Sequence, residues 1–132
     1  MGIKLGADLT ITKSGKYFRD SYNPSSTWWV IGLSYWEIND TLKKKKLLDE
    51  EGNVSLDGVK LIWNEIEKHP FTEDKVLAHI SRHRNDLGNL GVHKYTPENI
   101  RKWIQYFQKG DKEMRSFWKE AIKLKSSVEF SV

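Results

Sequence analysis

The chain of 132 residues contains no cysteine. This absence excludes disulfide bonds, thiolate nucleophiles and thiolate zinc sites, and it leaves histidine and carboxylate side chains as the ligands for any metal. No apolar run approaches the ~20 residues that a membrane span requires. The residues after Met1 form no signal-peptide core. We therefore expect a cytoplasmic protein that does not contact a membrane.

Catalytic signatures are also missing from the sequence. A nucleophile beside a base, a carboxylate pair or a glycine loop for phosphate would indicate an enzyme. The loop at residues 88–91 has too few glycines, and Ser81 and His83 would lie on different sides of a helix. We expect no catalytic residue, no cofactor and no enzymatic activity.

Large aromatic side chains are plentiful, with 6 Trp, 5 Tyr and 5 Phe, and apolar residues make up 38% of the chain. A chain of this length buries roughly two thirds of the surface that its unfolded form exposes. No linker or internal repeat divides it. We expect one domain over residues 1–132.

The hydrophobic pattern predicts an α+β, mainly α fold, with a short N-terminal β-hairpin or extended arm packed on a bundle of four to five helices. Apolar and polar residues alternate over residues 3–11, as in a half-buried strand, and residues 17–19 would pair back on it. The end of the chain would add a strand over residues 128–132 or fray. The helices expected from periodicity and capping residues cover about residues 28–48, with a strand at 28–31 as the alternative, and then 56–69, 72–86, 96–108 and 111–125. Gly110 and Asp111 interrupt the pattern, so the last two helices would form a hairpin.

The N-terminal aromatic residues are the main candidates for a binding surface. If one helix runs on from residue 28, Trp29, Leu33 and Trp36 share a face, which we assign to the core. The remaining rings and a neighbouring cation could receive a side chain of a partner protein. The partner-binding candidates are Tyr17, Arg19, Tyr22, Trp28 and Tyr35.

A second class of candidate is basic. The net charge of +4 is concentrated in the second half, where residues 67–132 carry 13 basic against 9 acidic side chains. Such an excess would attract nucleic acid, although it is also typical of a solvated surface. The Lys43–Lys46 run precedes three acids and is read as a solvated helix end. The alternative nucleic-acid-binding residues are Lys75, Arg82, Arg84, Arg101 and Lys102.

His79 and His83 are weak candidates for a metal site. Their i,i+4 spacing would place both imidazoles on one helix face. A third ligand would have to come from Asp86, His93 or His69. Ordinary hydrogen-bonded or solvent-facing histidines explain the pair more simply, so we expect no metal.

The segment Gly15-Lys16-Tyr17-Phe18-Arg19-Asp20, followed by Trp28-Trp29 and Trp36, resembles a group of small phage and prophage proteins. Those proteins begin Met-Gly and carry a Gly-x-Tyr-Phe-Arg-Asn/Asp segment before their tryptophans. The resemblance covers about the first 36 residues and implies an origin in a virus or mobile element. It favours a non-enzymatic accessory protein that binds and modulates a host protein, such as an inhibitor of antiviral defence. Nucleic-acid or nucleotide binding by the basic half is the alternative.

Overall fold

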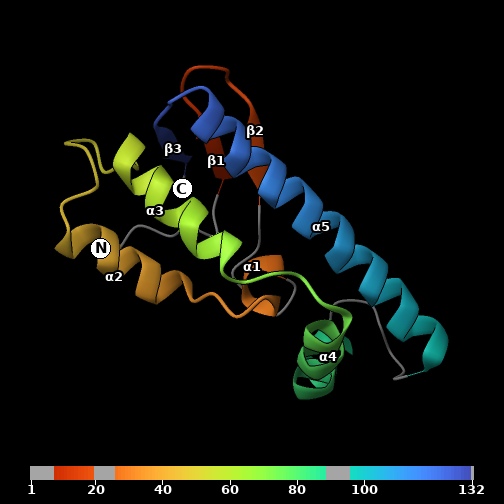
Figure 1. Ribbon diagram of the computed structural model, residues 1–132. Coiled ribbons are helices and arrows are strands. Elements are labelled where there is room, and N and C mark those ends of the chain that lie inside the picture. The colour runs from red at the N-terminus through yellow and green to blue at the C-terminus, as the bar shows by residue number, and fades with distance from the viewer. Residues whose placement is uncertain (1–7, 20–25, 89–95, 132) are drawn as a thin grey trace.

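The computed structural model describes residues 8–19, 26–88 and 96–131 (Figure 1). Five helices and a three-stranded antiparallel sheet make up this part of the chain, which confirms the mainly α fold with an N-terminal hairpin. The elements in chain order are β1 (Asp8–Ile11), β2 (Tyr17–Arg19), α1 (Thr27–Val30), α2 (Tyr35–Lys44), α3 (Leu56–Glu67), α4 (Glu73–Gly88), α5 (Pro97–Lys123) and β3 (Val128–Ser131).

The sheet joins the two ends of the chain. Strand β1 lies between β2 and β3, and Leu9 is opposite Phe18 on one side and Phe130 on the other. The predicted hairpin and C-terminal strand are both confirmed, whereas residues 3–7 of the expected first strand lie outside the described residues. Leu9 and Ile11 point into the core, since they are only 1% and 0% exposed.

The helix expected to run on from residue 28 is wrong, because the chain breaks after one turn. Helix α1 stops at Val30, and Gly32 adopts a φ of +95°, which side-chain-bearing residues rarely tolerate. Helix α2 then restarts behind Ser34, whose hydroxyl accepts a hydrogen bond from the Glu37 amide. Because of this break, Trp29 and the residues of α2 no longer belong to one helix, so the helical face predicted for them does not exist.

The hairpin expected at Gly110 is also wrong, because α5 continues through it for 27 residues, about 40 Å. Gly110 is needed for a close approach rather than for a turn: a Cβ atom there would lie 2.3 Å from Thr27 Oγ1. Helix α1 therefore rests directly on the backbone of α5. None of the helices in the described ranges combines the length and apolar character needed to cross a bilayer.

Helix α5 links two hydrophobic clusters. The larger one packs the sheet, α1, α2 and α3 against the C-terminal half of α5, around Phe117 and Trp118. The smaller one joins α1 and α4 to the N-terminal half of α5, around Val76, Ile80 and Phe107. In Figure 1, α5 crosses the molecule diagonally, with α3 beside it and α4 near its N-terminal half.

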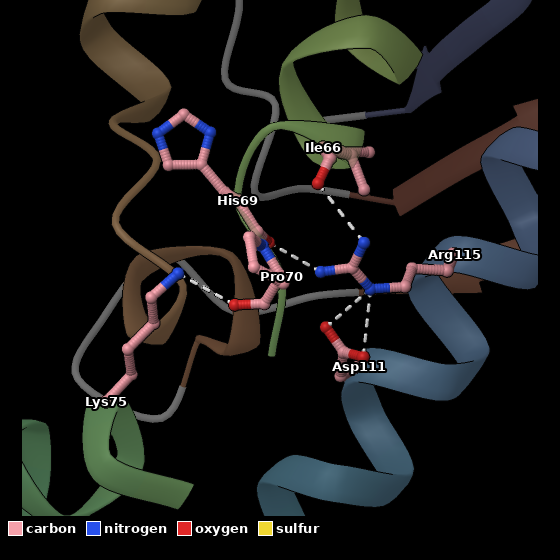
Figure 2. A network of polar contacts seen from close by, with 6 residues as sticks. All are labelled: Ile66, His69, Pro70, Lys75, Asp111 and Arg115. Atoms are coloured by element: carbon pink, nitrogen blue, oxygen red, sulfur yellow. Dashed lines mark hydrogen bonds and ion pairs between the residues drawn. The ribbon is translucent and has the colours of Figure 1, made fainter. Parts of the chain in front are cut away.

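A polar network fixes the connection from α3 to α4 onto α5 (Figure 2). Arg115 Nε lies 3.0 and 2.9 Å from the two carboxylate oxygens of Asp111. Its other nitrogens donate to the carbonyls of Ile66 at 3.1 Å and His69 at 2.6 Å. Lys75 Nζ donates to the carbonyl of Pro70 at 2.7 Å. The guanidinium thus satisfies the carbonyls of Ile66 and His69 at the end of α3, while Lys75 ties the first turn of α4 to Pro70.

Candidate functional site

A group of packed rings lies where α1, α4 and α5 meet, and we call it the Trp29 platform. Trp29 of α1 has its ring centroid 4.9 Å from that of His83 and 5.8 Å from that of His79. His79 is fully buried, and its ring packs edge-on against Phe107 at 5.6 Å. The platform comprises Trp29, His79, His83, Trp103, Tyr106 and Phe107.

Two rings of the platform face solvent while the others support them. Trp29 is 41% and Tyr106 51% exposed, whereas Phe107 is fully buried. Tyr106 packs on both Trp103 and Phe107, with centroids 5.1 and 5.3 Å apart. Exposed rings held by a rigid aromatic base can bury much area against a partner at small cost in side-chain entropy.

The two adjacent tryptophans, Trp28 and Trp29, have the opposite exposure to the one expected from the sequence. Trp28, expected on the binding surface, is 1% exposed and packs edge-on against Trp118 at 6.1 Å, so it belongs to the core. Trp29, expected in the core, is the exposed one. The reason is geometric: Thr27 is seated on Gly110, which turns the next residue of the one-turn helix toward α5. Leu33 is buried, as expected.

Tyr17 and Arg19 lie together on β2, at one edge of the sheet. Tyr17 is 55% exposed, and its hydroxyl donates a hydrogen bond to Asp8 Oδ1. Arg19 Nε lies 3.6 Å from the same oxygen. These two candidates are therefore accessible and adjacent. Tyr22 and the side chain of Tyr35 lie outside the described residues, as does the side chain of Trp36.

The hydrogen bond to Asp8 raises the pKa of Tyr17 above its ordinary value of 10.0, and the negative charge of Asp8 adds to the shift while Arg19 opposes it. Because the folded state favours the neutral phenol, its stabilising contribution is complete below the ordinary pKa and is lost as pH rises through the raised one. We expect Asp8→Ala to lower the pKa of Tyr17 and Arg19→Ala to raise it. Ultraviolet titration of tyrosinate measures both, with Tyr17→Phe identifying the transition. An unchanged titration in Asp8→Ala would contradict this contact.

The two histidines of α4 come together, with ring centroids 4.6 Å apart. His69 does not join them as a third ligand: its Nδ1 lies 2.7 Å from the Glu65 carbonyl oxygen, and its ring borders Gly32. His93 and the side chain of Asp86 lie outside the described residues. Within residues 8–19, 26–88 and 96–131, no group of three or more histidines and carboxylates is arranged to hold a metal ion.

The predicted phosphate-binding cations are only partly open. Lys75 donates to Pro70, and Lys102 Nζ lies 3.8 Å from Glu98 Oε1. Arg82 and Arg101 are exposed on two different helices, and the side chain of Arg84 lies outside the described residues. The lysines of the 43–46 run are exposed, as expected of a solvated helix end.

Tyr106, which is 51% exposed, is a candidate binding residue that the sequence pattern did not predict. Tyr106 falls next to Trp103 and Phe107 at the border of that face, where rings are half covered. An aromatic residue at the edge of a helix's apolar face is the signal that could have identified it.

Comparison with known proteins adds no relative: neither a protein-family model, nor a curated protein, nor a solved structure matches this chain.

Proposed function

We propose that this chain is a non-enzymatic accessory protein of a phage or another mobile element, which binds a host protein in the host cytoplasm and modulates it. Inhibition of an antiviral defence protein is the specific form that we favour. The observation that carries the proposal is the exposure of Trp29 on a buried aromatic base. Tryptophan and tyrosine dominate the binding energy of protein interfaces when they are held rigidly.

The contacts of Trp29 explain why it suits this role. The ring rests on His83 and His79 and leaves 41% of its surface to solvent. Its orientation is fixed before binding, so association would cost little additional side-chain entropy. The edge strand β2 offers a second accessible point, since it carries the exposed side chains of Tyr17 and Arg19 at one border of the sheet.

Affinity capture from bacterial lysate tests the proposal. The tagged wild-type protein should retain one host protein after nuclease treatment, and Trp29→Ala should reduce its recovery at least about tenfold, as expected for an interface hot spot. Leu124→Ala is the matched control, since Leu124 is 37% exposed at the far end of α5. It should leave capture unchanged.

A second variant separates the two surfaces. If Tyr17→Ala/Arg19→Ala abolishes capture while Trp29→Ala does not, the partner binds the sheet edge instead of the platform. Melting temperatures of all variants show whether a loss reflects unfolding. Equal capture by the wild type and by both variants would refute the proposed interface.

A further inference from the structure

The continuity of α5 aligns basic residues that a hairpin at Gly110 would have separated. At 3.6 residues per turn, Arg101, Lys112 and Lys119 are spaced by about three and then two whole turns and so lie on one line. Lys123 continues this line one turn further. The residues of this line, which we call the α5 stripe, are Arg101, Gln105, Gln108, Lys112, Ser116, Lys119 and Lys123.

Every member of the stripe is exposed, since it lies opposite the buried face that includes Trp103, Phe107 and Trp118. Glu113 and Glu120 project about 80–100° away from the line. Among the ion pairs of the described chain, none involves Arg101 or the three lysines of the stripe. Their charges are therefore presented to solvent without an acidic partner.

The charge of the protein is concentrated on this helix. Helix α5 has seven Lys or Arg and four Asp or Glu, so it holds a net +3 of the chain's +4. Three of those acids are already paired with a cation: Glu98 with Lys102 at 3.8 Å, Asp111 with Arg115 at 2.9 Å, and Glu120 with Lys16 at 3.7 Å. Lys16, which also approaches Ser116 Oγ at 3.5 Å, adds a cation next to the stripe.

We propose that the α5 stripe binds the phosphate backbone of a nucleic-acid duplex, independently of the Trp29 platform. The stripe extends for about 33 Å, close to the ~34 Å of one turn of B-DNA. Its amides and hydroxyl can donate hydrogen bonds to phosphate oxygens between the charged contacts. The proposed mode is electrostatic, so we expect affinity to depend on the phosphate charge of the duplex rather than on its sequence.

A lipid surface fits this face less well. Helices that lie on membranes pair their cations with large apolar residues that enter the bilayer. The stripe has none, because its positions alternate between cations, amides and a serine hydroxyl. The stripe consists of polar residues on one continuous helix, so it matches the phosphate backbone of a duplex better than the surface of a lipid bilayer.

Fluorescence anisotropy with a labelled mixed-sequence DNA duplex about two turns long tests the proposal. The wild type should bind with an affinity that falls steeply with salt. In Lys112→Gln/Lys119→Gln/Lys123→Gln, the slope of log K against log salt should fall by about 3, since each phosphate contact contributes ~0.9. At low salt the affinity should fall by more than about tenfold.

The matched control is Lys43→Gln/Lys44→Gln/Lys45→Gln, which removes the same charge from the end of α2, away from α5 in Figure 1. It should retain the wild-type slope and an affinity within about threefold. Equal losses in both triple variants would overturn the proposal, because net charge alone would then explain binding. Failure of the wild type to bind at low salt, or tighter binding through the same lysines to phosphatidylserine vesicles, would overturn it too. If the triple variant unfolds, Lys112→Gln alone should lower the slope by about 1.

Discussion

Replacing Arg115 with alanine is expected to destabilise the protein by about 3 kcal/mol, roughly 10 °C in melting temperature. Two backbone carbonyls, those of Ile66 and His69, would lose their donor. The Asp111 carboxylate, whose side chain is only 11% exposed, would keep its charge without a partner. The cost of that unpaired charge makes up much of the expected loss.

Urea unfolding of three further variants separates these causes. Arg115→Ala/Asp111→Ala should recover part of the loss, because the stranded carboxylate is gone. Arg115→Lys should fall between, since lysine keeps the charge and loses the fork that reaches three partners. Arg19→Ala removes an arginine–aspartate pair whose arginine side chain is 77% exposed, and should cost under about 0.5 kcal/mol. A similarly small loss in Arg115→Ala would show that the network contributes little.

Gly110→Ala is expected to destabilise the protein by about 2 kcal/mol, although alanine is the better helix former by about 1 kcal/mol. The two effects have opposite signs, so the sign of the measured change decides between them. The new Cβ would lie 2.3 Å from Thr27 Oγ1. Thr27 is 3% exposed and β-branched, so its side chain has little room to rotate away. Helix α1, and with it Trp29, would have to move off α5.

The double variant Thr27→Ala/Gly110→Ala tests this explanation. Removing Oγ1 leaves Thr27 Cβ as the nearest remaining atom, at an ordinary 3.5 Å. Compared with Thr27→Ala alone, the added Gly110→Ala should then be neutral or stabilising in chemical denaturation. A stabilising effect of Gly110→Ala in the wild-type background would show that α1 does not rest on this glycine as described.

Features specified by neighbouring residues were predicted well. The helices expected to begin at about residues 56 and 96 do begin there, where the hydroxyls of Ser55 and Thr96 accept hydrogen bonds from the amides of Gly58 and Asn99, both at 3.2 Å. The hairpin of β1 and β2 was expected from the alternation of residues 3–11, and in the structure Gly15, with a φ of +73°, lies in the turn between the two strands. Capping and turn formation depend on residues within a few positions, so their signals are complete in the sequence.

The candidate site was predicted less well, because its geometry depends on contacts distant in sequence. In the sequence, Gly110 is typical of a helix break. In the structure it lies within a continuous helix, and the absence of a side chain there leaves room for Thr27. The exchange of Trp28 and Trp29 depends on that same contact, together with the break at Gly32. The pairing of Trp29 with His79 and His83 joins residues about 50 positions apart.

The sequence by itself determined the helical class, most element boundaries, the basic balance and the aromatic content of this protein. Only the tertiary structure decided which tryptophan faces solvent and which cations share a line. A propensity is local, whereas exposure follows from which helix packs on which face, as the close approach of Thr27 to Gly110 shows for α1 and α5. Both surfaces proposed for binding depend on such packing: α1 carries the exposed Trp29 where it lies on α5, and the continuous helix α5 brings the cations of the stripe onto one face.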